Sequence, residues 1–181
     1  MNRLHAFLAH EKQKKGWRFW LLWVVATNIG FGIGVGLEWL ILGRITNLVA
    51  VPLGGVGQVL VLNRHVPRHV LQHVPVGWMW AIASAVGWWL GMLPAGWLLT
   101  SFAPGLSFWP YAVAYAGIAG SIVGVTTRWV LRRAGLDAHW WWILVSAGGW
   151  AAQAPGMVTG IFLARMLHST DSKQRTAFPL S

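Results

Sequence analysis

The stretch WAIASAVGWWLG, residues 80–91, lies within a longer region, residues 69–127, that contains no Asp, Glu, Lys or Arg. Over the whole chain of 181 residues, 56% are apolar and only 10% are charged. A soluble protein of this length would have to expose part of the uncharged region to water, whereas a bilayer accepts it. The sequence therefore predicts an all-α, polytopic membrane protein.

Five segments are long and apolar enough to cross the hydrocarbon core, which requires about 20 apolar residues per helix. They cover residues 17–41, 45–62, 76–100, 109–130 and 139–167, and together they form a predicted transmembrane domain over residues 17–167. Residues 1–16 are expected to be cytoplasmic and to include an interfacial amphipathic segment. Residues 168–181 are expected to form a polar tail, and Pro52 predicts a kink within the second span.

The basic residues predict how the chain is oriented. The sequence has 14 Lys and Arg against 4 Asp and Glu, and most of the basic residues precede the first span or follow the second and fourth spans. The positive-inside rule then places the N-terminus in the cytoplasm and, after five crossings, the C-terminus outside. Topology and anionic lipid headgroups account for the basic excess, so no nucleic-acid partner is expected.

Two looser copies of the opening stretch occur at residues 23–34, WVVATNIGFGIG, and at residues 142–153, WILVSAGGWAAQ. Each copy has a Trp, then Thr or Ser four residues later, Gly at seven and an aromatic residue at eight. These offsets share one helical face, and small residues on such a face let helices approach closely in lipid. The predicted packing residues are Thr27, Gly30, Gly34, Ser84, Gly87, Gly91, Gly120, Gly124, Ser146 and Gly149.

A second motif also repeats, since GVGQVLVLNR at residues 55–64 aligns with GVTTRWVLRR at residues 124–133. The repeating unit is therefore interpreted as a pair of helices, with the fifth span as an unpaired third copy. The pair resembles the module of uncharacterised multi-spanning membrane proteins of phototrophic and related bacteria, which repeat W-x3-[ST]-x2-G-W and G-x2-Q-W-L-V-L-R-R spans. Here Val59 stands where that module has its Trp, and Thr127 replaces its Gln. The resemblance implies a bacterial cytoplasmic (inner) or photosynthetic membrane, and no established activity.

Glu38 is the only acidic residue inside a predicted span. An intramembrane carboxylate is a functional candidate by default. Glu38 lies near the end of its span, however, six residues before Arg44. This position favours an interfacial structural role over a role in proton or cation movement.

The histidines suggest a cofactor site. His65, His69 and His73 recur every four residues, a spacing that can place three imidazoles on one helical face for a tetrapyrrole or a metal. Pro67 interrupts such a face, so a basic interfacial loop is favoured. The candidate tetrapyrrole ligands are His69, His73 and His139, and no metal site is predicted. The 15 Trp residues allow packing against a chlorophyll-type pigment or a carotenoid, but interfacial anchoring and gap filling are favoured. Bound lipid is expected.

No nucleophile, base and orienting residue occur together, and no Walker loop or zinc motif is present, so no enzyme is predicted. The leading hypothesis is an accessory or scaffolding subunit that packs its Gly and Trp faces against other subunits of a larger integral membrane complex. The resemblance, and not the residues alone, favours a photosynthetic complex. The alternative is a small transporter of a lipidic or neutral solute, for which the sequence offers few polar or helix-breaking groups, mainly Asn28, Pro52, Gln153 and Pro155.

Overall fold

The computed structural model describes residues 2–43, 47–65, 76–136, 138–152 and 154–177. These residues form six helices: α1 (Asn2–Leu42), α2 (Ala50–His65), α3 (Val76–Phe102), α4 (Phe108–Arg133), α5 (Trp141–Ala151) and α6 (Pro155–Ala177). No strand occurs in the described parts of the chain. The all-α fold class is therefore as predicted.

Three stretches among the described residues are long and apolar enough to cross a membrane: Gly16–Leu42 of α1, Gly77–Phe102 of α3 and Phe108–Arg133 of α4. They coincide with the first, third and fourth predicted spans and support a multi-pass membrane protein. The other helices are shorter or more polar. At 1.5 Å per residue, α2 is about 24 Å long and α5 about 17 Å, less than the hydrocarbon core of about 30 Å.

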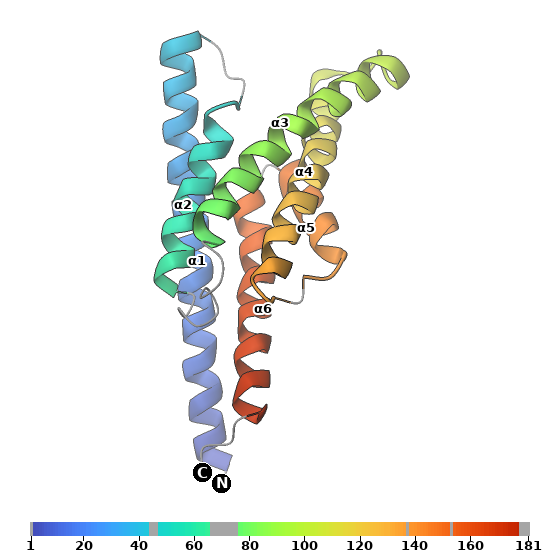
Figure 1. Ribbon diagram of the computed structural model, residues 1–181. Coiled ribbons are helices and arrows are strands. Elements are labelled where there is room, and N and C mark those ends of the chain that lie inside the picture. The colour runs from blue at the N-terminus through green and yellow to red at the C-terminus, as the bar shows by residue number, and fades with distance from the viewer. Residues whose placement is uncertain (1, 44–46, 66–75, 137, 153, 178–181) are drawn as a thin grey trace.

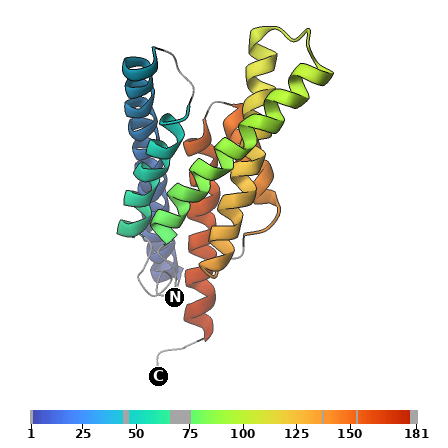
Figure 2. The ribbon, with the colours of Figure 1, turned by 45° about the horizontal axis from the view of Figure 1, so that its top comes forward.

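The six helices form a closed ring of three antiparallel pairs, α1 with α2, α3 with α4, and α5 with α6 (Figure 1). Between pairs, α2 packs on α3, α4 packs on α5, and α6 packs on α1. Figure 2 shows the same arrangement, with α6 alongside the lower part of α1. Each helix therefore has two neighbours, and one side of every helix faces the middle of the ring.

The predicted fifth span, residues 139–167, is wrong, because two helices occupy it. Helix α5 ends at Ala151, and α6 begins at Pro155 and runs back toward the end from which α5 started. The Ala154 N–H donates to the Gly149 carbonyl over 2.8 Å and closes this turn. Proline cannot continue α5 but is well placed at the first position of α6. The first and last described residues consequently lie at the same end of the bundle, contrary to the predicted placement of the termini on opposite sides.

Helix α1 ends at Leu42 in a capped turn, and α2 begins at Ala50. Gly43 follows α1 with a φ of +64°, and its N–H donates to the Trp39 carbonyl over 3.0 Å, which is a left-handed helix cap. Because α2 begins at Ala50, Pro52 lies in its first turn, where a missing N–H breaks no helical hydrogen bond. The predicted kink within the second span is therefore wrong.

Candidate functional site

Three tryptophans that open the three sequence copies, Trp23 on α1, Trp80 on α3 and Trp142 on α5, meet in the middle of the ring. At most 3% of each side chain is exposed. The ring centroid of Trp80 lies 5.6 Å from that of Trp23 and 5.9 Å from that of Trp142, with edge-to-face geometry in both pairs. These three residues are called the first aromatic layer.

Every indole N–H of the first aromatic layer is hydrogen-bonded to a side chain of a neighbouring helix. Trp23 donates to Thr159 over 3.4 Å, Trp80 to Gln58 over 2.6 Å, and Trp142 to Thr127 over 2.9 Å. The Gln58 amide also donates to the Thr27 hydroxyl over 3.1 Å and so links α2 to α1. The layer is thus fixed by paired polar groups as well as by packing.

The sequence contained an overlooked signal for the third of these hydrogen bonds. GMVTGIFLAR, residues 156–165, aligns with GVGQVLVLNR and GVTTRWVLRR, and it places Thr159 at the position of Gln58 and Thr127. The leucines at the eighth position of the three segments, Leu62, Leu131 and Leu163, are at most 2% exposed. Recognising this third segment would have divided the predicted fifth span into two helices.

A second aromatic layer lies eight residues further along the odd-numbered helices and consists of Phe31, Trp88 and Trp150. The Trp150 ring centroid lies 4.6 Å from that of Trp88 and 6.4 Å from that of Phe31. Trp88 is only 2% exposed, yet its indole N–H has no hydrogen-bond partner among the described residues. The second layer therefore lacks the polar pairing that fixes the first.

A cavity of about 150 Å³ is lined by residues of both aromatic layers and by the residues between them. A cavity of this volume accepts a molecule of about the size of benzene. Aromatic side chains from α1, α3 and α5 form much of its wall, and small polar side chains form the rest. The polar residues of the buried wall are Thr27, Gln58, Ser84, Thr127, Ser146 and Thr159.

The threonine hydroxyls of this wall are already engaged. Each donates to a backbone carbonyl one turn earlier, as Thr127 does to Val123 over 2.7 Å, and each accepts from Trp23, Gln58 or Trp142. The serines differ, because Ser84 and Ser146 are 6% and 2% exposed and neither hydroxyl makes a hydrogen bond with a described residue. The cavity therefore holds two hydroxyls that are free to donate and to accept.

The cavity lining contains no Asp, Glu, Lys, Arg or His within the part of the chain that the structure describes. Burying a charge without a partner is far more costly than burying a hydrogen-bonded neutral group. The arrangement therefore suits an uncharged molecule that can hydrogen-bond to a serine hydroxyl and place apolar atoms against indole rings.

The predicted packing face serves two purposes. Its glycines lie where another helix approaches: a Cβ atom at Gly91 would lie 2.8 Å from the Ala119 Cα, and one at Gly124 would lie 2.8 Å from the Ile143 Cα. The same holds for Gly30, Gly34, Gly87, Gly120 and Gly149, which meet Leu53, Ala50, Val123, Trp150 and Pro155. In contrast, the hydroxyl-bearing members of the predicted face, Thr27, Ser84 and Ser146, line the cavity.

Glu38 does not belong to the cavity. Its carboxylate is fully buried and accepts backbone N–H groups of Asn47 over 2.6 Å, Val49 over 2.5 Å and Ala50 over 2.9 Å. These groups lie just before and at the first residue of α2, so the carboxylate of α1 caps the N-terminus of α2. Glu38 therefore has a structural role, as the sequence favoured, although its carboxylate is buried and not solvated at an interface.

Of the predicted cofactor ligands, His139 alone belongs to the described residues. His69, His73 and Gln153 lie outside the described residues. His139 precedes α5 and is exposed, with its ring centroid 5.8 Å from that of Trp140. Among the described residues, no group of three His, Cys, Asp or Glu side chains could hold a metal ion. A tetrapyrrole is too large for a cavity of about 150 Å³. Pigment binding at His69, His73 or His139 stays a prediction.

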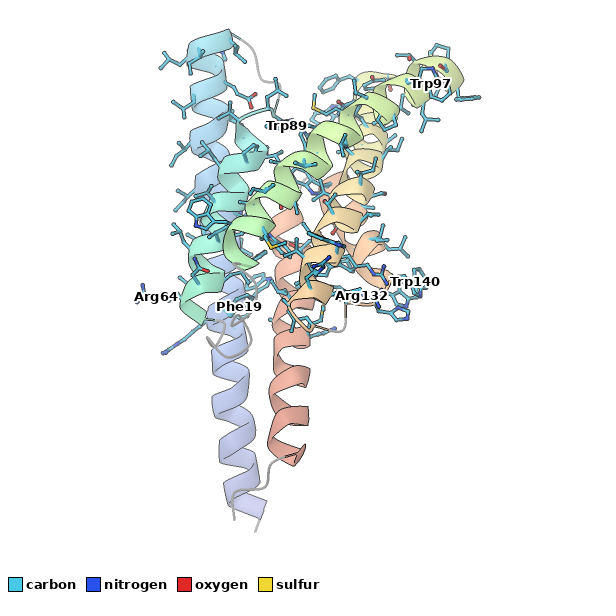
Figure 3. The ribbon with its side chains drawn as sticks, in the orientation of Figure 1. Phe19, Arg64, Trp89, Trp97, Arg132 and Trp140 are labelled. Carbon is cyan, nitrogen blue, oxygen red and sulfur yellow. The ribbon has the colours of Figure 1, made fainter. Side chains whose placement is uncertain are left out.

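Aromatic and basic side chains mark the two ends of the bundle. Figure 3 shows Arg64, Arg132 and Trp140 toward the end where α2 and α4 finish, and Trp97 toward the opposite end of α3. Trp97 and Trp140 are 63% and 47% exposed. Exposed Trp at both ends and Arg at one end are typical of helices held between two membrane interfaces.

No protein-family model, curated protein or solved structure matches this chain. The described residues form the six helices of an all-α, multi-pass membrane protein, and the cavity between these helices is its candidate functional site.

Proposed function

We propose that this protein is a carrier for a small uncharged solute, which binds in the cavity between the two aromatic layers. The main support for this proposal comes from two buried residues of the cavity lining, Ser84 and Ser146, whose hydroxyls have no hydrogen-bond partner among the described residues. A hydrogen bond between a solute and one of these hydroxyls contributes about 0.5–1.5 kcal/mol. A solute with a hydroxyl, carbonyl or amide group would pair with these serines and gain that energy on binding.

The depth of the cavity supports a carrier. Ser84 lies about 12 Å along α3 from Val76, which is well inside a hydrocarbon core of about 30 Å. The chain also breaks close to this depth, because Ala154, Pro155 and Gly156 at the start of α6 line the cavity. Solute sites near the membrane midplane, beside interrupted helices, are common in secondary transporters.

The charge selectivity of binding tests this proposal. Butyramide, butyrate and butylammonium share one carbon skeleton, so the thermal midpoint of the purified protein should rise with butyramide alone, as expected for a ligand that binds only the folded state. Ser146→Leu should fill the cavity and abolish this rise. The matched control is Ser121→Leu, because Ser121 is half-buried on α4 and lies outside the cavity lining. Equal shifts with all three compounds, or a shift that survives Ser146→Leu, would refute solute binding in this cavity.

A second candidate function is the accessory subunit of a larger membrane complex. Exposed apolar residues form one stripe along the whole of α3, at helical spacing: Trp78, Ile82, Val86, Trp89, Leu93 and Trp97. Trp in a membrane concentrates at the interfaces, whereas Trp89 is 47% exposed near the middle of α3 (Figure 3). A neighbouring helix would cover this indole better than lipid tails. Gentle extraction should then yield a much larger complex that is lost on Trp89→Glu but retained on Leu60→Glu, an exposed position of α2.

We further propose that the end bearing Arg64, Arg132 and Arg133 faces the cytoplasm, with both termini there. The exposure of these three arginines and the positive-inside rule support this orientation. The sequence has no cysteine, so single cysteines report topology directly. In intact cells an impermeant thiol reagent should label Ser107→Cys, in the α3–α4 turn, and should leave Asn63→Cys unlabelled. The reverse pattern would invert the orientation.

A further inference from the structure

The wall of the cavity is closed on most sides and open on one. Of its lining residues, only Asn28 on α1 and Met157 on α6 are exposed at the molecular surface. Four others, Phe31, Trp150, Ala154 and Pro155, are half-buried, and the remainder are buried. The two exposed residues belong to neighbouring helices, since α1 and α6 lie side by side (Figure 1). The mouth of the cavity is therefore between α1 and the first turn of α6.

The surroundings of this mouth are apolar. Asn28 lies about 18 Å along α1 from Gly16, the start of its membrane-spanning stretch, and so at a depth where lipid tails surround the helix. Exposed neighbours on the two helices are Ile29, Val25 and Ile161. An opening at this depth and in this setting faces the bilayer and not the aqueous phase.

The contact between α1 and α6 is also built differently from the contacts within the first two helix pairs. Gly34 meets the backbone of Ala50, and Gly91 meets the backbone of Ala119, so those helices touch main chain to main chain. Gly156 and Gly160 of α6 instead meet side-chain atoms, of Thr27 and Trp23. The ring atoms of Trp20 and Trp23 next to Gly160 can move by a change of rotamer without movement of a helix, whereas the Cβ atom of Thr27 next to Gly156 is fixed by the backbone.

Two hydrogen bonds hold the contact near the mouth. The Trp20 indole N–H donates to the Met157 carbonyl over 3.0 Å, and the Trp23 indole N–H donates to the Thr159 hydroxyl over 3.4 Å. The second is the longest of the three hydrogen bonds of the first aromatic layer. Asn28 adds a polar group at the entrance itself, with its amide N–H donated to the Val24 carbonyl over 2.8 Å.

We infer that the solute enters the cavity sideways from the bilayer, between α1 and α6, past Asn28 and Met157. The inference rests on the proposed function and narrows its substrate class. The solute is a membrane-soluble, largely apolar molecule of about benzene size with one uncharged hydrogen-bonding group, which pairs with Ser84 and Ser146 once inside.

Single-cysteine labelling in native membranes tests the route. Ser146→Cys is nearly isosteric, and the absence of cysteine from the sequence makes it the only thiol. Methyl methanethiosulfonate, a small neutral reagent, should modify this thiol, and the cationic trimethylammonium-ethyl methanethiosulfonate should not. Ile82→Cys, which is 61% exposed on α3, gives the rate for a lipid-facing thiol, and Ala95→Cys, which is fully buried outside the cavity, gives the rate for a sealed one.

Substitutions at Met157 then narrow or widen the mouth of the cavity. Met157→Trp should slow modification of Ser146→Cys by about tenfold, and Met157→Ala should accelerate it. Ile161→Trp is the matched control, because Ile161 is 41% exposed one turn further along α6 and does not line the cavity. Equal rates in the Met157→Trp and Ile161→Trp proteins, or modification by the cationic reagent at the neutral reagent's rate, would overturn the lateral route. If Ser146→Cys is modified no faster than Ala95→Cys, the cavity does not admit small molecules and the proposed function itself fails.

Discussion

The two aromatic layers occupy equivalent positions in the sequence but differ in how their polar atoms are used. In the first layer, Trp23, Trp80 and Trp142 all donate their indole N–H groups to side chains of adjacent helices. In the second layer, the Trp88 N–H has no partner among the described residues, and the neighbouring serines are equally unpaired. Since an unpaired buried polar group costs free energy, the paired first layer should stabilise the ring more than the second layer, whose Phe31 and Trp150 line the cavity proposed as the solute site.

The largest loss of stability should come from a substitution that forces α3 and α4 apart next to the second aromatic layer. Gly91 meets the backbone of Ala119, which packs with Trp88, Val51 and Val123. Gly91→Leu should therefore lower the free energy of unfolding by about 3 kcal/mol, near the upper end of overpacking costs. Gly148→Leu is the control, because nothing lies within 4 Å of a Cβ atom there. Thermal or chemical denaturation in detergent measures both, and equal losses would contradict the assigned helix contact.

A change outside both layers should affect stability alone. Glu38→Gln replaces one carboxylate oxygen by an amide N–H that faces a backbone N–H at the start of α2. Hydrogen bonds to charged groups contribute about 1.5–3 kcal/mol, so a loss of about 2 kcal/mol is expected. Butyramide should still raise the thermal midpoint of this variant, since Glu38 does not line the cavity. Loss of the butyramide response would place Glu38 in the solute site.

Two matched substitutions compare the layers directly. Trp80→Phe and Trp88→Phe remove the same atoms from buried positions, but only Trp80→Phe leaves a buried acceptor, the Gln58 amide oxygen, without its donor. The Trp80→Phe protein should be less stable than the Trp88→Phe protein by about 1–2 kcal/mol. Comparable losses of unfolding free energy in the two variants would remove the distinction between a paired and an unpaired layer.

The smallest change in the free energy of unfolding is expected when Ser84 or Ser146 loses its hydroxyl. Ser84→Ala and Ser146→Ala break no hydrogen bond with a described residue, so each should change the free energy of unfolding by less than about 0.5 kcal/mol. A loss above about 1 kcal/mol in either variant would show that the hydroxyl is already paired within the protein.

Much of the fold follows from spacing in the sequence. The offsets of four, seven and eight place Trp23, Thr27 and Phe31 on one face of α1, and the structure turns that face toward the middle of the ring. Hydropathy alone did not divide residues 139–167, because α5 and the first half of α6 are both apolar and only Pro155 interrupts them. A proline inside an apolar run is compatible with a kinked span as well as with a new helix.

The cavity was harder to predict than the face that lines it. Small residues on a helix face permit close packing, and the glycines do pack closely. Whether Ser84 and Ser146 contact a helix or a cavity depends on the width of the ring at their depth. That width depends on how α1, α3 and α5 pack against one another across the ring, which no local pattern specifies.

Direct binding of butyramide to the protein in lipid nanodiscs tests whether Ser84 and Ser146 form a solute site. Equilibrium dialysis with radiolabelled butyramide should show saturable binding at a single class of site in the wild type. The Ser84→Ala/Ser146→Ala double variant should unfold at the same thermal midpoint as the wild type. In this variant the saturable binding of butyramide should disappear, and only partitioning into lipid should remain. Identical saturable binding in the two proteins, or no saturable binding in either, would contradict a solute site at these serines.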